Sequence, residues 1–111
     1  MYTDRFNTLW VTRVQYDNHV EKHASEHGGE DNYLQEVRDA MAQVRAQPDD
    51  LVTGWMGNFQ SGPKRRAATI TYLGEDDNKR KYRVHIARSS GQPRILVVTN
   101  NGEVVTYHKN D

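Results

Sequence analysis

The two halves of the chain distribute their apolar residues with different periods. In the first half, one segment repeats apolar residues at i, i+3, i+7 and i+10; they are Leu34, Val37, Met41 and Val44. This spacing places them on one stripe and predicts an amphipathic helix. We expect Asp31 or Asn32 to cap its beginning and Pro48 to stop it.

An earlier helix is expected in the segment DNHVEKHASEHGG at residues 17–29. Its first two residues are good N-caps for a helix that begins near His19, and the pair Gly28–Gly29 should end it. Residues 8–16 are rich in β-branched and aromatic side chains, so they predict a short strand directly before this helix.

The second half alternates with a period of two, which is typical of strands. The expected strands cover residues 67–73, 81–87, 94–99 and 104–108. In the second strand, one face carries Tyr82, Val84 and Ile86, and the other carries Lys81, Arg83 and His85. Residues 51–66, with four glycines or prolines, predict a loop or irregular strand anchored by Trp55 and Phe59.

The dipeptide Asn101–Gly102 predicts a two-residue hairpin between the last two strands. Such a turn pairs Thr99 with Val104 and Val97 with Thr106. Both faces of this hairpin carry apolar side chains, so the pattern leaves its core side open. The expected fold is α+β: a single domain, residues 1–111, with N-terminal helices packed on a four- to five-stranded antiparallel meander.

Composition adds a charge asymmetry to this picture. The net charge is zero, but residues 1–60 carry −5 and residues 61–111 carry +5. Either the halves pair with each other, or the second half presents a basic face to a polyanion. The chain has no cysteine, which excludes disulfides, thiolate metal sites and cysteine catalysis. No apolar run is long enough to cross a membrane, so we expect no membrane partner.

His19, His23 and His27 recur every fourth residue. On a helix this spacing turns each side chain by about 40° from the one before, so we expect all three on one face. They fit three interpretations. The first is a zinc site, but the H-E-x-x-H motif of catalytic zinc sites is absent, because Val20 follows His19. The second is a structural role, either as incidental histidines on a polar helix face or with one histidine packed and hydrogen-bonded in the core. Acid–base catalysis would use the histidines together with Lys22, which stabilises developing negative charge.

The basic half holds a second group of polar side chains suited to phosphate recognition. Its members are Lys81, Arg83, His85, Arg88, Arg94, Thr99, Thr106, Tyr107 and His108, with the basic run at residues 64–66. Each of them alone is more often a charged or polar side chain on the surface than part of a site. Together with the histidine helix they indicate a ribonuclease that needs no metal.

The order of these segments resembles the barnase/EndoU/colicin/RelE-like (BECR) ribonucleases, which include C-terminal toxin domains of bacterial contact-dependent and other polymorphic toxin systems. Many of them carry K-H-x-x-x-[F/H]-G on an early helix and G-x-[IV]-x-T-[YF] on a final strand. The first motif is matched by Lys22, His23, Glu26, His27 and Gly28, and the second by Gly102, Val104, Val105, Thr106 and Tyr107. The similarity covers residues 17–31 and 66–111.

The resemblance implies cofactor-free and metal-independent cleavage of RNA, often tRNA, by attack of the ribose 2′-OH on the adjacent phosphate. His19 or His23 would be the general base, and the general acid would be the other histidine, His85 or Lys22. Arg83, Thr106 and Tyr107 would hold the phosphorane. The substrate-binding residues would be Lys81, Arg88, Arg94 and Thr99.

The resemblance also implies where such a protein acts and what binds it. It would act in the bacterial cytoplasm, after secretion or delivery as the C-terminal part of a larger protein. An acidic immunity or antitoxin protein would cover the basic sheet. Two other classes fit the residues: a non-catalytic RNA- or nucleotide-binding module, and an immunity or interaction protein with its histidines on the surface.

Overall fold

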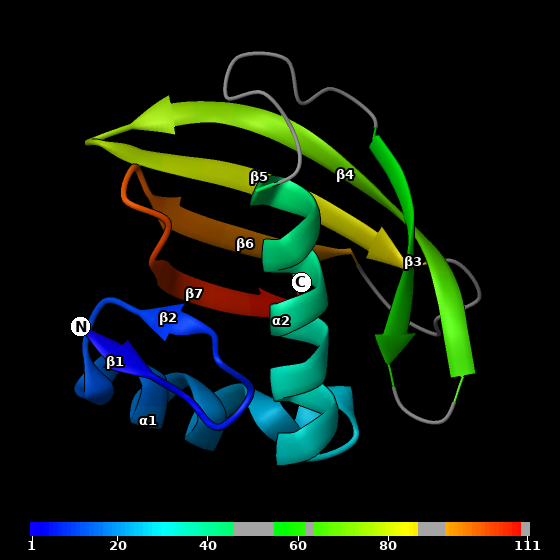
Figure 1. Cartoon of the computed structure of the whole chain (residues 1–111), viewed down its shortest axis with the longest axis horizontal. Helices are drawn as coiled ribbons and strands as arrows, with labels where there is room; N and C mark the ends of the chain where they lie inside the picture. Colours follow the sequence, from blue (N-terminus) through cyan, green and yellow to red (C-terminus); the bar gives the residue numbers. More distant parts are fainter. Residues whose placement is uncertain (46–54, 62–63, 87–92, 110–111) are drawn as a thin grey trace.

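The computed structural model describes residues 1–45, 55–61, 64–86 and 93–109, which form one mixed sheet with helices beside it (Figure 1). The helical elements are α1 (Arg13–His23), the 3₁₀ turn η1 (Ala24–His27) and α2 (Glu30–Arg45). The strands are β1 (Tyr2–Thr3), β2 (Leu9–Trp10), β3 (Trp55–Ser61), β4 (Lys64–Asp76), β5 (Lys79–Ile86), β6 (Arg94–Thr99) and β7 (Val104–Lys109).

The expected α+β class is confirmed, but the sheet is larger than expected and not purely antiparallel. The strand order is β1-β2-β7-β6-β5-β4-β3. From β3 to β7, each strand is antiparallel to the next, which is the expected meander. The N-terminal strands extend it, because β2 pairs with β7 in parallel through Trp10 and Val104. The sheet therefore has seven strands in the described part of the chain.

The expected strand at residues 8–16 is cut short by a helix cap. The hydroxyl of Thr12 accepts a hydrogen bond of 3.1 Å from the backbone N–H of Gln15. Such a cap satisfies one of the unpaired donors of a first helical turn. Helix α1 therefore begins at Arg13 rather than near His19, which places His19 inside the helix and His23 at its end.

The helical segment ends at the expected glycines, but it changes type first. After His23 the chain continues as η1, and Gly28 follows with a φ of +84°. A side chain there would be strained, and its Cβ would lie 2.9 Å from Asn32 Nδ2. A 3₁₀ turn advances about 120° per residue instead of 100°. His27 therefore leaves the face of His19 and becomes buried, so the expectation of three histidines on one face is wrong.

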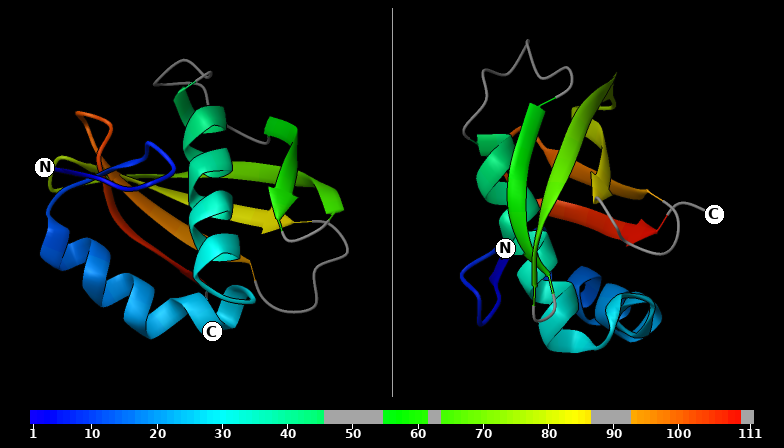
Figure 2. Two further views of the ribbon diagram at one scale, coloured as in Figure 1. Left: turned by 60° about the horizontal axis from the view of Figure 1, so that its bottom comes forward. Right: turned by 90° about the vertical axis from the view of Figure 1, so that its right-hand side faces the viewer.

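Helix α2 covers one face of the sheet, as Figures 1 and 2 show. Its expected apolar stripe is confirmed, because all four residues are buried. The sheet side chains buried on this face are Ile70, Tyr82, Val84, Leu96, Val98, Val104 and Tyr107. The face of the last hairpin that carries Leu96, Val98 and Tyr107 is therefore the one that packs in the core. We call the opposite side of the sheet the outer face; by alternation it carries Lys81, Arg83, His85, Ile95, Val97, Thr106 and His108.

The β6–β7 turn contains three residues, 100–102, instead of the expected two. Its glycine has a φ of +86°, as the last residue of such a loop requires. The observed pairs are Val97–Thr106, as expected, and Val98–Val104 in place of Thr99–Val104. The longer turn shifts the pairing by one residue, and a bulge between Val97 and Val98 restores the expected register.

The segment at residues 51–66, expected as a loop or irregular strand, contributes β3 and the start of β4, which pair antiparallel. The side chains of Trp55, Phe59 and the basic run 64–66 lie outside the described residues, as does Pro48. Strand β4 extends beyond the expected 67–73. The turn that follows it uses Asp77 and Asn78, both at positive φ, as type I′ hairpins require.

A buried carboxylate ties α2 to the sheet and to η1. Glu36 Oε1 accepts hydrogen bonds from Arg94 Nε at 2.7 Å on β6, from the Tyr107 hydroxyl at 2.5 Å on β7, and from His27 Nδ1 at 3.2 Å. None of the four residues is more than 7% exposed. We call them the Glu36 cluster.

The cluster keeps Glu36 ionised. Burial raises the pKa of the carboxyl, but the hydrogen bond and charge of His27, the charge of Arg94 and the hydrogen bond of Tyr107 outweigh it and hold the pKa at about 2. Burial, and then the charge and hydrogen bond of Glu36, raise the pKa of Tyr107 well above its ordinary value. The phenol therefore stays a donor and the carboxylate stays an acceptor at neutral pH.

We expect acid to weaken the fold through Glu36. Its pKa is about 2 in the folded state against an ordinary value of 4.5. The ionised carboxylate therefore stabilises the fold above pH 4.5. This stabilisation, on the order of 3 kcal/mol, is lost as the pH falls from there through 2. Urea unfolding between pH 6 and pH 2 measures it.

Replacing Glu36 identifies the source of this pH dependence. Glu36→Gln should lower the free energy of unfolding at neutral pH by about 3–5 kcal/mol, because the buried guanidinium of Arg94 loses its ion pair with the Glu36 carboxylate. It should also flatten the fall between pH 4.5 and 2. Glu21→Gln, at an exposed position of α1, is the matched control and should match the wild type. An unchanged acid profile in Glu36→Gln would contradict this account.

Candidate active site

Three histidines from the two ends of the chain meet beside β7. His19 and His23 come from successive turns of α1, and His108 comes from the outer face of β7. The ring centroids lie 5.7 Å apart between His19 and His23 and 5.4 Å apart between His23 and His108. All three side chains are partly exposed. We call them the histidine row.

Two rings of the row are anchored to backbone carbonyl groups. His19 Nδ1 lies 2.8 Å from the oxygen of Gln15, and His108 Nδ1 lies 2.9 Å from the oxygen of Lys109. A carbonyl oxygen can only accept a hydrogen bond, so Nδ1 carries the proton in both rings.

The third ring has a charged anchor. His23 Nδ1 lies 3.1 Å from Glu26 Oε2. Because an ionised carboxylate also only accepts, Nδ1 is again the donor. Within the described residues, no Nε2 of the row has a hydrogen-bond partner. In a neutral ring this Nε2 is unprotonated, so it is the atom that can take a proton from a substrate.

The surroundings of His19 lower its pKa. Burial is the largest cause, and the positive charges of His23, His108 and Lys22 add to it, while the hydrogen bond to Gln15 opposes it. The ring also packs against Trp10, with centroids 6.3 Å apart. The environment of His19 thus favours its neutral form.

Glu26 stays ionised beside His23. Burial raises its pKa, but the hydrogen bond and charge of His23, the charge of His27 and the backbone N–H of Lys109 outweigh burial and lower it. The row therefore holds a histidine that favours the neutral form next to one bonded to a carboxylate.

A column of basic side chains lies two strands away on the outer face. Lys81, Arg83 and His85 project from β5 and are exposed; we call them the basic column. The register aligns Arg83 with Ile95 and Ile95 with His108, so Arg83 and His108 are about 10 Å apart across the sheet. The row and the basic column therefore border a strip of the outer face over β6.

Four of the residues expected to be catalytic lie in or beside the row. They are His19, His23, Lys22 and Thr106. Lys22 is exposed next to His23, and Thr106 shares the outer face with His108 two residues away. Arg83 and His85 belong to the basic column instead. His85 lies two residues beyond Arg83 on β5. It therefore belongs with the binding residues and does not lie beside His23, where a general acid would be needed.

Tyr107 and Arg94 are not available to a substrate. Both belong to the Glu36 cluster, and they are 0% and 4% exposed. Strand alternation explains this placement, because Tyr107 follows Thr106 and therefore faces α2. The expectations that Tyr107 holds the phosphorane and that Arg94 binds substrate are wrong.

Thr99, which was expected to bind substrate, lies away from the histidine row. The hydroxyl of Thr99 accepts a 3.1 Å hydrogen bond from the Glu103 N–H in the β6–β7 turn, about 13 Å along β6 from Ile95. Arg88 lies outside the described residues. Lys81, also expected to bind substrate, lies in the basic column.

His108 and Glu26 belong to the site, although His108 was expected only in the phosphate-recognition group and Glu26 only as part of the helix motif. His108 shares its face with Thr106 by simple alternation, and Glu26 follows His23 by three residues, a spacing at which helical side chains meet. Both signals are present in the sequence. The packing of α1 beside β7 is the information that a linear pattern lacks.

The described residues contain no group of three or more His, Cys, Asp or Glu side chains placed to hold a metal ion. In the same part of the chain, no helix combines the length and apolarity that a membrane span requires.

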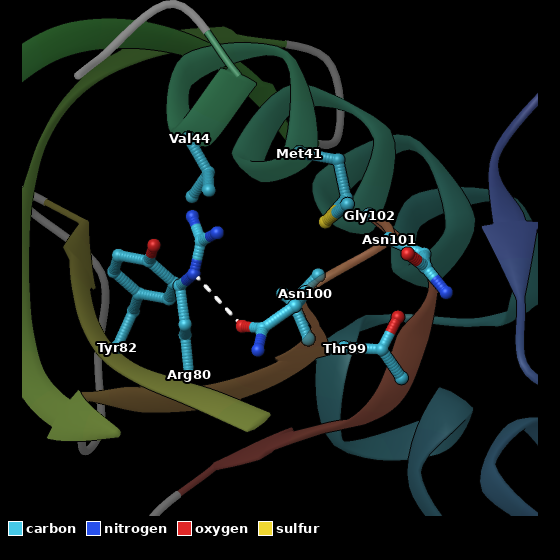
Figure 3. Close-up of a pocket in the computed structure, with 9 residues that line it drawn as sticks. Met41, Val44, Arg80, Tyr82, Thr99, Asn100, Asn101 and Gly102 are labelled. Atoms are coloured by element: carbon cyan, nitrogen blue, oxygen red, sulfur yellow. Dashed lines mark hydrogen bonds between the residues drawn. The ribbon is translucent and has the colours of Figure 1, made fainter. Parts of the chain in front are cut away.

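A cavity of about 260 Å³ lies on the α2 side of the sheet, near the β6–β7 turn (Figure 3). Met41, Val44 and Val98 contribute to its apolar wall. On its polar side, Arg80 Nε donates a hydrogen bond of 3.2 Å to Asn100 Oδ1. Arginine keeps its proton in proteins, so this side chain offers contacts rather than proton transfer. The histidine row is therefore the better candidate for an active site.

No protein-family model matches the chain, and no curated protein or solved structure is significantly similar to it. The resemblance to the BECR ribonucleases therefore stays a prediction. The geometry of the histidine row carries the functional inference.

Alanine variants should separate the surface histidines from the core histidine. His27→Ala removes a donor from the Glu36 carboxylate and leaves a buried void, at a cost of roughly 2 kcal/mol. We expect its Tm to fall by about 10 °C. His23→Ala, at a side chain that is 22% exposed, should stay close to the wild-type Tm. Thermal unfolding followed by circular dichroism measures both, and equal losses would contradict the division.

Proposed function

We propose that this protein is a metal-independent endoribonuclease. The observation that carries the proposal is the histidine row, in which every ring is held through Nδ1 and presents a free Nε2 at a partly exposed surface. Histidine is the usual proton-transfer residue at neutral pH, and adjacent rings can act as base and acid on one phosphate. The basic column supplies cations for the neighbouring phosphates.

The proposed reaction needs no external nucleophile. A base of the row takes the proton of the ribose 2′-OH, and the oxygen forms a bond to phosphorus. The bond from phosphorus to the 5′-oxygen breaks, and an acid of the row protonates that oxygen. The products are a 2′,3′-cyclic phosphate and a free 5′-OH. Thr106, on the same face as His108, and Lys22, next to His23 in the chain, would stabilise the charge that develops on the phosphorane.

The biological setting is proposed on the family resemblance. It supports a toxin that acts on RNA, above all tRNA, in the bacterial cytoplasm after delivery as part of a larger protein. An acidic immunity protein would neutralise it. The exposed cations of the basic column, Lys81 and Arg83, give such a partner a surface of opposite charge.

A second candidate function is RNA binding without cleavage. The basic column favours it, because a row of exposed cations on a rigid sheet is sufficient to hold phosphates. This class would retain RNA affinity but leave the RNA intact.

Cleavage of total tRNA in the presence of EDTA distinguishes the two functions. We expect cleavage to persist in EDTA and to leave 2′,3′-cyclic phosphate ends. His23→Ala should lower the rate by about 10²–10⁴, the usual loss for a general acid or base. His85→Ala, the same change on the outer face but outside the row, should cost far less. Activity that EDTA removes and zinc or magnesium restores would overturn the metal-free mechanism.

The salt dependence of RNA affinity tests the basic column. In a His23→Ala background, which keeps the RNA intact, Arg83→Ala should reduce the slope of log affinity against log salt by about one. Arg13→Ala, at an exposed position of α1, is the control and should leave the slope unchanged. If Arg13→Ala changes the slope as much as Arg83→Ala does, the binding surface is not the outer face.

A further inference from the structure

The two α1 histidines of the row differ in the charge of their anchors. His19 donates to a neutral carbonyl group, that of Gln15, whereas His23 donates to the carboxylate of Glu26. A neutral acceptor fixes the ring orientation without favouring a second proton. A carboxylate does both, because its negative charge stabilises an imidazolium.

The groups that face these two rings enlarge the difference. His19 faces His23, Lys22 and His108, all of which are or become positive, and no carboxylate among the described residues is bonded to it. The groups around His23 from the three elements beside it are His19 and Lys22 on α1, Glu26 on η1, and His108 with the backbone of Lys109 on β7. Only Glu26 in this set is an anion.

The backbone of Lys109 connects the two anchors at the end of β7. Its carbonyl oxygen accepts from His108 Nδ1, and its N–H interacts with the Glu26 carboxylate. Glu26 is therefore bonded to His23 and lies near the end of the strand. A carboxylate held in this way sets the orientation of His23 as well as its charge.

We infer that His23 is the general acid, that His19 is the general base, and that Glu26 is the positioning residue that divides these roles. The inference rests on the proposed ribonuclease function. In the step, His19 Nε2 takes the 2′-OH proton as the bond from O2′ to phosphorus forms. The bond from phosphorus to O5′ breaks, its electron pair stays on O5′, and His23 Nε2–H gives that oxygen its proton. His19 ends protonated and His23 neutral, and exchange with water restores both.

A change of leaving group separates the acid from the base. RNA releases an alkoxide that needs a proton, whereas a uridine 3′-(4-nitrophenyl phosphate) releases a phenolate that leaves without one. His23→Gln should lower RNA cleavage by about 10²–10⁴ but leave cleavage of the aryl ester close to wild type. His19→Gln should lower cleavage of both substrates, because both use the same 2′-OH.

Other outcomes overturn the assignment in defined ways. Equal losses on both substrates in His23→Gln remove His23 as the acid, and a reversed pattern exchanges the roles. If His19→Gln cleaves both substrates normally while His108→Gln cleaves neither, the base is His108. A wild-type protein that cleaves neither substrate overturns the ribonuclease proposal, and with it this assignment.

The pH–rate profile tests Glu26. Activity rises with pH as the base loses its proton and falls as the acid loses its proton. Glu26→Gln keeps an acceptor for Nδ1 but removes the charge, so the alkaline limb should move to lower pH while the acidic limb stays. Glu21→Gln, an exposed position on α1, is the matched control and should move neither limb. A uniform loss at every pH would reduce Glu26 to a structural role and overturn its part of the inference.

A spectroscopic measurement tests the geometry without any activity. Long-range proton–nitrogen NMR correlations report which ring nitrogen is protonated in each neutral histidine. We expect the Nδ1–H form for His19, His23 and His108, as their anchors require. An Nε2–H form in His19 would overturn its assignment as the base even in a protein that cleaves RNA.

Discussion

One buried carboxylate determines how the helices meet the sheet. Glu36 projects from α2 into the core and accepts hydrogen bonds from η1, β6 and β7 at a single oxygen. A buried charge of this kind is tolerated only when its partners are in place, so the three elements must arrive in one arrangement. The packing of α2 on the sheet buries the apolar surface that stabilises the fold, and the hydrogen bonds of Glu36 restrict how the helix is placed on the sheet.

The same constraint divides the histidines. His27 is drawn into the core as a donor to Glu36, and the 3₁₀ turn that carries it lets the chain leave α1 at a new angle. His19 and His23, which precede that turn, stay at the surface beside β7. Evenly spaced histidines therefore have two different roles: His27 is structural, whereas His19 and His23 are available for chemistry. Tyr107 and Thr106 on β7 divide in the same way, because adjacent strand residues face opposite sides.

Local sequence patterns predicted those elements for which periodicity, composition and capping residues all favour the same structure. The stripe of α2 and the bounds of β6 followed directly from periodicity, as did the faces of β5 at Lys81 and Tyr82. The start of α1 did not, because residues 8–16 favour a strand by composition and one hydroxyl, that of Thr12, overrides them with a cap. Residues 55–61 have no clear strand pattern, yet they form β3, because they pair with β4 through backbone hydrogen bonds.

The candidate site was predictable only in part: His19 and His23 were expected in it, whereas its contact with His108 and the burial of Tyr107 were not. Alternation along the last hairpin gave two faces, and both were partly apolar, so nothing local distinguished core from surface. Arg94 and Tyr107 therefore looked available, although they serve Glu36. The contact of His23 with His108 depends on tertiary packing, which no spacing rule encodes.

The parallel pairing of β2 with β7 has a consequence for the order in which the molecule matures. Trp10 and Val104 are neighbours in the sheet but stand at opposite ends of the chain, and the partners His23 and His108 are 85 residues apart. Contacts of such long range close late in folding and late in synthesis. A nascent chain whose β7 has not yet emerged from the ribosome carries α1 without His108, the histidine partner of His23. The contact between His23 and His108 can therefore form only once β7 has left the exit tunnel.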